Sequence, residues 1–246
     1  MKLQGKTILI TGGSSGIGLA LARRLADENQ VVSAGRDEAR LARAREQASG
    51  LRTRRLDVTS EEDATGTIGW LETELGGLDL LVNNAGLFRG YPFATAEAAD
   101  YAREDIDVNL AGAIRMTRLA LPLLRASQSG GVVFVSSGVA LGAVPGFAVY
   151  AATKAAVRSL ARSLRVELRP TGIRVVEVLP PIVDTGASQG LDVPKLSPGA
   201  VAGAIVQGLE RDRDEIRIGR IKQLAPIARL SPGLADRLLA RAVANR

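Results

Sequence analysis

The 246-residue sequence contains no cysteine and no histidine. The absence of cysteine excludes disulfides, thiolate metal sites and a cysteine nucleophile. The absence of histidine removes the commonest metal ligand and the general base of serine–histidine hydrolases. Any acid or base that works near neutral pH must therefore be a tyrosine, lysine, aspartate or glutamate with a perturbed pKa.

Aromatic residues and long apolar runs are also scarce. One Trp, three Tyr and four Phe occur, and the 32 basic residues are spread over several segments. A nucleic-acid platform of stacking rings among basic residues is therefore not expected. The net charge of +6 is interpreted as a soluble, arginine-rich surface. No apolar run reaches the ~18 residues that cross a membrane, and the start at Met1–Lys6 lacks the apolar region of a signal peptide, which predicts a cytoplasmic protein.

Short apolar runs alternate with longer amphipathic segments. Strands are predicted at Thr7–Ile10, Val31–Ala34, Thr53–Leu56, Leu78–Val82, Val132–Val135, Arg174–Leu179 and Glu215–Ile218. Helices are predicted near 16–28, 38–48, 60–75, 97–126 (broken), 150–168 and 198–210. This alternation predicts an α/β fold: a doubly wound parallel sheet of about seven strands, with helices on both faces, in a single domain over residues 1–246. Such sheets bind ligands outside the carboxyl ends of their strands.

A glycine-rich turn follows the first predicted strand. Gly12, Gly16 and Gly18 let the backbone turn tightly and approach a pyrophosphate, and the following helix offers free N–H groups. The spacing differs from the Gly-x-Gly-x-x-Gly of other dinucleotide folds. After the second strand, Gly35 stands where an acid would bind the adenosine ribose, and Arg36 follows it. Because a guanidinium suits a phosphate, this pair favours NADP(H) over NAD(H); the alternative is that Arg36 is solvated or stacks on adenine.

Tyr150 and Lys154 are spaced by one helical turn and therefore share one helix face. A free phenol titrates near pH ~10, too high for useful ionisation at neutrality. A nearby cation, together with the positive charge of a bound nicotinamide, would favour the phenolate, so Lys154 is expected to lower the pKa of Tyr150. The pair predicts general acid–base catalysis by Tyr150.

The motifs, taken in order, resemble the short-chain dehydrogenase/reductase family. They are Thr11–Gly18 (TGGSSGIG), Asn83–Gly86 (NNAG), Asn109, Ser137 and Tyr150-x-x-x-Lys154. The resemblance runs from about residue 5 to about residue 220. Val178–Thr185 further resembles a branch labelled DltE-like. The family resemblance implies a Rossmann-type fold and a nicotinamide cofactor, with no metal.

The resemblance also implies roles for individual residues. Ser137 would hold the substrate carbonyl, with Ser136 as the competing choice, and Asn109 would hold a water at a helix irregularity and support proton resupply to Lys154. The implied cofactor contacts lie in five turns and on the catalytic helix: Gly12, Ser14, Ser15, Gly16, Ile17, Gly18, Arg36, Asp57, Val58, Asn83, Ala85, Gly86, Tyr150, Lys154, Pro180, Val183 and Thr185. Asp57 is equally interpretable as a turn or cap residue, and Asn83 as a residue that holds the sheet together.

Three features depart from the pattern or stay open. Pro181 replaces the family's usual glycine, which predicts a stiffer loop with one donor fewer. The segment 185–197 is predicted as a substrate lid, or else an ordinary surface connection. The helix predicted over 232–246 has an apolar stripe of Leu234, Leu238, Leu239 and Val243, with Arg237, Arg241 and Arg246 elsewhere; it is expected to pack on its own protein or on a second subunit rather than on a membrane.

The sequence thus predicts an NADP(H)-dependent oxidoreductase that interconverts a carbonyl and an alcohol. The catalytic set would be Asn109, Ser137, Tyr150 and Lys154. The alternative is a non-catalytic NADP(H)-binding regulatory protein. The partners expected are a small-molecule substrate, and a second copy of the chain in a homotetramer or homodimer through helices 109–126 and 150–168.

Overall fold

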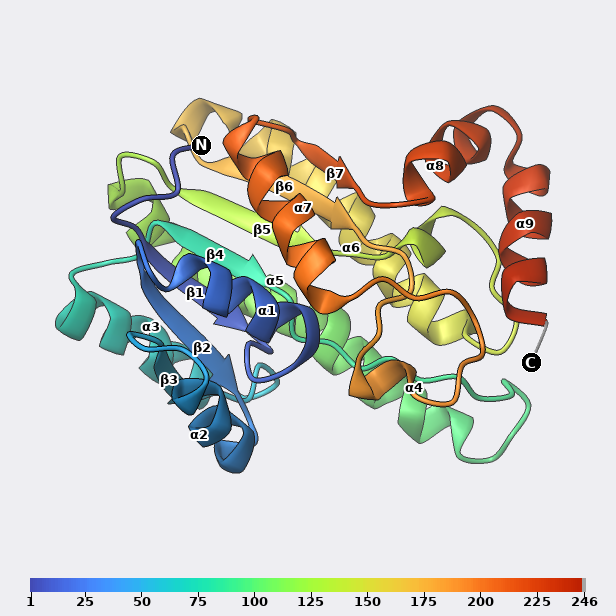
Figure 1. Ribbon diagram of the computed structural model, residues 1–246, viewed down its shortest axis with the longest axis horizontal. Coiled ribbons are helices and arrows are strands. Elements are labelled where there is room, and N and C mark those ends of the chain that lie inside the picture. Colours follow the sequence, from blue (N-terminus) through green and yellow to red (C-terminus); the bar gives the residue numbers. More distant parts are fainter. Residues whose placement is uncertain (245–246) are drawn as a thin grey trace.

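The computed structural model describes residues 1–244, and its centre is a parallel sheet of seven strands (Figure 1). The strand order is β3-β2-β1-β4-β5-β6-β7. The strands are β1 (Thr7–Thr11), β2 (Gln30–Gly35), β3 (Arg52–Arg55), β4 (Leu80–Asn83), β5 (Gly131–Val135), β6 (Arg174–Leu179) and β7 (Glu215–Arg217). Every neighbouring pair is parallel, so the predicted doubly wound sheet is confirmed.

Helices cover both faces of the sheet. They are α1 (Gly16–Leu25), α2 (Glu38–Glu46), α3 (Glu61–Leu75), α4 (Ala98–Ile106), α5 (Gly112–Ala126), α6 (Ala148–Glu167), α7 (Pro198–Glu210), α8 (Ile221–Leu230) and α9 (Pro232–Ala244). Three short 3-10 helices, η2 (Gly138–Leu141), η3 (Arg169–Thr171) and η4 (Gly186–Ser188), connect them. The apolar side chains of α1 and α7 meet one face of the sheet, and those of α3, α5 and α6 meet the other.

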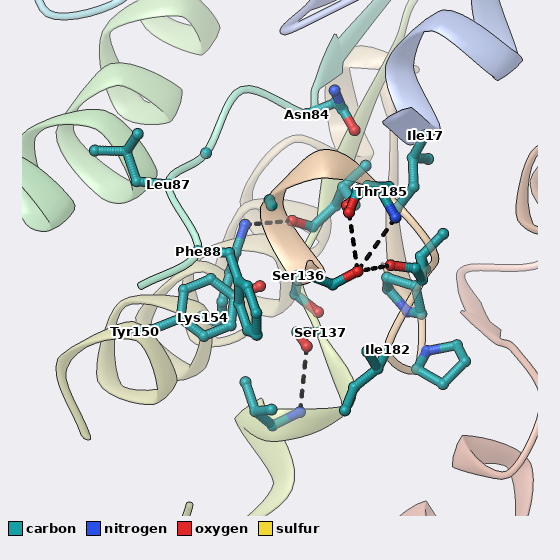
Figure 2. Close-up of a pocket in the computed structure, with 18 residues that line it drawn as sticks. Ile17, Asn84, Leu87, Phe88, Ser136, Ser137, Tyr150, Lys154, Ile182 and Thr185 are labelled. Carbon is teal, nitrogen blue, oxygen red and sulfur yellow. Dashed lines mark hydrogen bonds between the residues drawn. The ribbon is translucent and has the colours of Figure 1, made fainter. Parts of the chain in front are cut away.

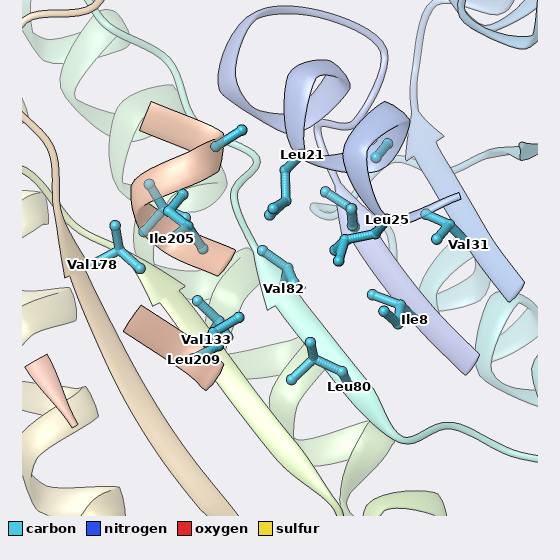
Figure 3. Packing of buried hydrophobic residues seen from close by; sticks show 14 of the residues in the cluster. Ile8, Leu21, Leu25, Val31, Leu80, Val82, Val133, Val178, Ile205 and Leu209 are labelled. Carbon is cyan, nitrogen blue, oxygen red and sulfur yellow. The ribbon is translucent and has the colours of Figure 1, made fainter. Parts of the chain in front are cut away.

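The core consists of two apolar layers, one on each face. Ile8 of β1 packs in the layer that contains Leu21 and Leu25 of α1 (Figure 3). Ile10 belongs to the same layer, whereas Leu9 between them belongs to the opposite layer. Strands buried on both faces need apolar side chains at every position, which explains the continuous apolar runs in the sequence.

The long helical stretch between β4 and β5 is broken, as predicted. Helix α4 is followed by a π-helical segment, η1 (Asp107–Ala111), and then by α5. A π-helical turn inserts an extra residue and is common at functional sites. Asn109 lies in this turn and is 1% exposed. The irregularity expected at Asn109 is therefore present.

The C-terminal region contains one helix that was not predicted. Helix α8 includes Pro226, which removes a backbone donor and argues against a helix in the sequence. Helix α9 matches the predicted helix, although Arg246 and the side chain of Val243 lie outside the described residues. Both helices extend beyond the carboxyl ends of the strands (Figure 1). Within residues 1–244, no helix is long and apolar enough to cross a membrane.

Candidate active site

The carboxyl ends of β1 and β4 are tied together where the sheet changes its winding direction. The side-chain amide of Asn84 donates to the carbonyls of Thr11 and Gly12, both at 3.0 Å. In return, the hydroxyl of Thr11 accepts from the backbone N–H groups of Asn84 and Ala85, both at 3.1 Å. Doubly wound sheets bind their ligands at this switch point.

The glycine turn fits an anion at the start of α1. Gly12 has a φ of +64°, which favours glycine, and a Cβ added at Gly18 would overlap the carbonyl of Gly12. Helix α1 begins at Gly16, its cap residue Ser15 makes no side-chain hydrogen bond, and its first turn has no acidic residue. The first amide groups of the helix therefore have no side-chain acceptor, as a phosphate site requires.

The turn after β2 is tight for any side chain at residue 35. A Cβ added at Gly35 would lie 3.1 Å from the hydroxyl of Ser14. The next side chain, Arg36, is half exposed, and its guanidinium is 4.0 Å from the carboxylate of Asp57. Asp57 accepts from the N–H and the hydroxyl of Thr59 at 2.9 and 2.8 Å. Burial raises the pKa of Asp57, but these bonds and the nearby Arg36 outweigh it, so the pKa is lowered.

An inner cavity of about 140 Å³ lies beside the glycine turn (Figure 2). Its lining combines residues from the ends of β4, β5 and β6 with residues of α1 and α6: Ile17, Asn84, Gly86, Leu87, Phe88, Val135, Ser136, Ser137, Val139, Tyr150, Lys154, Pro180, Pro181, Ile182, Val183, Thr185, Ala187 and Ser188. Of the predicted catalytic residues, Ser137, Tyr150 and Lys154 thus share one cavity. The segment 185–197 contributes its first residues to this wall.

Tyr150 packs against the aromatic ring of Phe88. The Phe88 ring meets the Tyr150 ring edge-on with 4.9 Å between centroids, and Phe88 also stacks on Phe147 at 4.9 Å. Burial raises the pKa of Tyr150 to about 12, although a hydrogen bond with Ser137 opposes the rise; the charge of Asp105 adds to it. In the protein alone, Tyr150 is therefore a protonated phenol at neutral pH, suited to donate a proton.

Lys154 is buried, with 5% of its surface exposed. Its ammonium donates to the carbonyl of Val135 at 3.0 Å and lies 5.8 Å from the centre of the Tyr150 ring. Burial lowers the pKa of Lys154 to about 8. The expected lowering of the Tyr150 pKa by Lys154 is absent in the protein alone: burial of both side chains dominates, and the pKa of Tyr150 moves upward.

Asn109 connects the β4 loop to α6. Its amide oxygen accepts from the N–H of Leu87 at 2.7 Å, and its amide nitrogen donates to the carbonyl of Leu87 and to the hydroxyl of Thr153 at 3.0 and 3.1 Å. A Cβ added at Gly86 would lie 3.1 Å from the Asn109 oxygen and 3.3 Å from the Lys154 nitrogen. Gly86 thus allows the loop to pass close to both side chains.

A buried charge network supports the end of β5. The hydroxyl of Ser136 donates to the carboxylate of Glu177 at 2.7 Å, and Arg158 donates to the other oxygen of that carboxylate at 2.7 Å. Burial raises the pKa of Glu177, against the opposing effect of Ser136 and Arg158. Ser136 and Ser137 both line the inner cavity, but the hydroxyl of Ser136 is engaged by Glu177. Sequence reasoning did not identify Glu177 or Arg158, because no local motif links them.

Some predicted cofactor residues have structural partners. Asn83 is buried in β4 and donates to the hydroxyl of Thr117 at 2.9 Å, as expected for a residue that holds the sheet together. The Val58 side chain belongs to the core. Asn84, which was not selected from its motif, lines the cavity instead. Successive side chains along a strand point to opposite faces. Asn83 therefore packs inside the sheet, and its neighbour Asn84 faces the cavity.

A larger outer cavity of about 540 Å³ adjoins the inner one. The two share Ser137, Val139, Pro180, Pro181 and Ile182 in their linings. The far wall of the outer cavity comes from α8 and α9, and its rim from residues 192–194. Leu238 and Leu239 of the predicted apolar stripe lie in this wall, so α9 contacts its own protein there.

The fold and the order of the motifs define a class of dinucleotide-binding oxidoreductases, and the comparison with known sequences identifies the family. The sequence model described as short chain dehydrogenase matches residues 6–195. The chain belongs to the short-chain dehydrogenase family and is an oxidoreductase of that type.

Its relatives agree with this assignment. An uncharacterized oxidoreductase named DltE from Bacillus subtilis is 35% identical over 237 residues, which are 93% of this chain and 94% of that protein. An uncharacterized oxidoreductase from Staphylococcus saprophyticus is 33% identical, over 86% of this chain and 94% of that protein. The DltE-like resemblance is thereby confirmed.

Two solved structures have the same fold. A short chain dehydrogenase from Burkholderia cenocepacia, in complex with NADP, has a TM-score of 0.85 at 27% identity and covers 97% of this chain and 99% of its own. A 3-ketoacyl-(acyl-carrier-protein) reductase from Brucella melitensis, complexed with NADH, has a TM-score of 0.80 at 27% identity and covers 88% of this chain and 98% of its own.

Proposed function

We propose that the protein is an NADP(H)-dependent oxidoreductase that interconverts a carbonyl compound and an alcohol. The observation that carries the proposal is the convergence of Ser137, Tyr150 and Lys154 on the inner cavity, beside the glycine turn. A protonated phenol, a hydroxyl and a buried ammonium in one cavity are the groups that a carbonyl reduction needs.

The residues present fit a nicotinamide dinucleotide. The start of α1, free of side-chain acceptors, suits the pyrophosphate. The inner cavity of about 140 Å³ matches the size of an engineered cavity of ~150 Å³ that holds benzene, so it can take a flat six-membered ring such as nicotinamide. Gly12, Ile17, Asn84 and Thr185 would line the path between these two parts.

The chain's own residues divide the chemistry among them. A bound nicotinamide cofactor supplies or accepts the hydride. In reduction, the Ser137 hydroxyl orients the carbonyl oxygen, and the Tyr150 hydroxyl transfers its proton to that oxygen. Lys154, in our proposal, holds the ribose and keeps positive charge near the phenolate that forms. In oxidation, the same phenolate takes the proton back.

Asn109 positions this set, in our proposal, rather than touching the substrate. Its side chain is bonded to Leu87 and Thr153, and Thr153 immediately precedes Lys154. Loss of these bonds would free the loop at Gly86 and the α6 turn that carries Lys154. Support of proton resupply by Asn109 stays a prediction.

The function is tested by a panel of aldehydes and ketones, each offered with NADPH and with NADH. Oxidation of either cofactor in the presence of a carbonyl, with the matching alcohol as product, is the expected result. A protein that binds NADPH but reduces no carbonyl would instead support the regulatory alternative.

Arg36 is expected to set the cofactor preference. Arg36→Ala should weaken NADPH binding about ten-fold and change NADH binding less than two-fold. A charge-assisted bond to a phosphate is worth about 1.5–3 kcal/mol, and the half exposure of Arg36 places its effect at the lower end of that range. Fluorescence titration of both cofactors measures this. Arg43→Ala, which removes an exposed arginine from α2, is the matched control for net charge. Equal affinity of the wild type for NADPH and NADH would rule out the preference.

We also propose a cytoplasmic homo-oligomer, a dimer or a tetramer, with helices 109–126 and 150–168 at its interfaces. Exposed apolar side chains lie on both helices: Ile114 on α5 is 44% exposed, and Val166 on α6 is 76% exposed. Ala152 and Ala155 of α6 are small and exposed, which permits close helix approach.

Light scattering at micromolar concentration should give at least a dimer mass. Ala155→Arg should reduce the mass, because a charged side chain would enter the interface, whereas Ala39→Arg on the exposed face of α2 should not. A monomeric wild type, or an equal effect of the two variants, would contradict this assembly.

A further inference from the structure

The outer cavity is built by close contacts that fix α8 and α9 against the active site. A Cβ added at Gly138, the neighbour of Ser137, would overlap Ile221 at the start of α8. A Cβ added at Gly142 would lie 2.7 Å from the carboxylate of Asp236 in α9, which accepts from the N–H of Ala143 at 2.8 Å. The two glycines of the η2 region thus allow both helices to form a wall directly beyond Ser137.

The body of this cavity is apolar. Val144, Ile221, Leu224, Ile227 and Leu239 contribute to its walls. Its volume of about 540 Å³ is well above the ~150 Å³ that holds a benzene molecule and is within the range of ~300–1,000 Å³ typical of small-molecule sites. This space has room for a substrate that reaches in from Ser137, is larger than a simple ketone and carries an extended apolar part.

The rim of the cavity is charged, with a positive balance. Arg220, Arg241 and Asp192 line it, and all three are exposed. Among the described residues, the side chains of all three lack a hydrogen-bond or ion-pair partner. Two guanidinium groups against one carboxylate favour an anionic ligand group, and the planar fork of arginine suits a carboxylate.

We propose that the outer cavity is the substrate site and that its substrate is an elongated carbonyl compound with an apolar body and a carboxylate. The carbonyl lies at Ser137, the apolar body lies against α8 and α9, and the carboxylate is held at the rim by Arg220 and Arg241. This inference rests on the proposed function, because it names the substrate class of the same site.

The test removes positive charge and negative charge from the rim in separate variants. Linear ω-oxo carboxylic acids of about six to twelve carbons, sized for such a cavity, are compared with alkanals of the same length. The measured quantity is the ratio of kcat/KM for the acid to kcat/KM for the alkanal. In the wild type the ratio should exceed one. Arg220→Ala and Arg241→Ala should each lower it by roughly three- to ten-fold, because the lost contacts are charge-assisted but exposed to solvent.

Asp192→Asn should raise the same ratio, because it removes the carboxylate that repels the acid. Arg237→Ala is the matched control: Arg237 is an exposed arginine of α9 that donates to the carbonyl of Gly233, and its loss should leave the ratio unchanged. A collapsed wall would affect acid and alkanal alike, so opposite shifts at Asp192 and the arginines separate charge from folding. A ratio near one in the wild type, or equal ratios in all variants, would overturn the proposal.

Calorimetric titration tests the substrate class independently of the proposed function, because binding can be measured without turnover. Decanoate and 1-decanol are titrated into the wild type and into the Arg220→Ala and Arg241→Ala variants. Tighter binding of decanoate, weakened by both substitutions, supports the site even if no carbonyl is reduced, in which case only the proposed function fails. Equal binding of the two probes, or no effect of the arginines on decanoate, overturns the substrate class even if simple aldehydes are reduced.

Discussion

Tyr150→Phe is expected to lower kcat for carbonyl reduction by roughly 10²- to 10⁴-fold, the usual contribution of a positioned general acid. The sequence has no histidine that could replace the phenol. The substitution removes one hydroxyl and keeps the ring that packs edge-on against Phe88. NADPH affinity should change little, because the proposed cofactor contacts are spread over several turns. Steady-state kinetics and a fluorescence titration of NADPH measure the two quantities.

The matched control is Tyr101→Phe, which removes a phenol hydroxyl on α4 that is outside the inner cavity. It should retain near-wild-type kcat. If Tyr150→Phe kept wild-type kcat as well, another acid would have to be responsible. A parallel loss of NADPH binding and of activity in Tyr150→Phe would indicate a damaged site rather than a missing proton.

The pH dependence of the two directions follows from the same side chain. Burial raises the pKa of Tyr150 to about 12, so the phenol form is present throughout the neutral range. Reduction uses this protonated form, whereas oxidation uses the phenolate, which becomes more abundant as pH rises. Alcohol oxidation should therefore accelerate with increasing pH while reduction does not, and the difference should disappear in Tyr150→Phe.

The parts of the fold that were predictable are those in which local pattern and tertiary structure agree. The runs around Ile8–Ile10 and Val132–Val135 are apolar at each position because both faces of these strands are buried. Helix α8 is different. Pro226 argues against a helix locally, but Ile221 and Ala225 are buried, and this packing outweighs the lost hydrogen bond.

The candidate site was predictable where its residues belong to short motifs. The glycine turn and the Tyr150–Lys154 spacing are local and were found directly. The contacts of Ser136 with Glu177, and of Glu177 with Arg158, join three elements and have no local signature. The same holds for the wall of α8 and α9 at the outer cavity, whose residues follow the motif-bearing part of the chain.

The pKa shifts of Tyr150 and Lys154 could not be read from their spacing, because they depend on burial. A cation at i+4 lowers the pKa of a phenol only when burial does not disfavour the charged forms by more than the cation favours the phenolate. Here each side chain loses solvent, which disfavours the charged form of each: the pKa of Tyr150 rises and that of Lys154 falls. At neutral pH the cofactor-free site therefore holds a protonated phenol beside an ammonium whose charge is disfavoured by burial.

Lys154 is for this reason expected to limit the stability of the cofactor-free protein. No carboxylate among the described residues pairs with its ammonium, which has the carbonyl of Val135 as its recorded acceptor. The pKa is about 8 in the folded protein against 10.5 for an ordinary lysine. Between these values the unfolded chain binds more protons than the folded one, so stability rises with pH in this window. Below pH ~8 both states are protonated and the cost of the buried charge is complete.

Lys154→Met should remove this dependence while lowering kcat by roughly 10²- to 10³-fold, as expected for loss of a positioned charge. In urea unfolding without cofactor, wild-type stability should rise by about 2–3 kcal/mol between pH ~8 and pH ~10, whereas the variant should lack that rise. The window ends near pH ~10 because the raised pKa of Tyr150 changes stability in the opposite direction. Above that pH the folded protein keeps a proton that the unfolded chain loses, so stability falls as pH rises. Lys2→Met, which removes an exposed ammonium, should behave like the wild type. Parallel pH curves for wild type and Lys154→Met would show that the buried Lys154 ammonium does not destabilise the folded protein. That result would contradict the lowered pKa of Lys154.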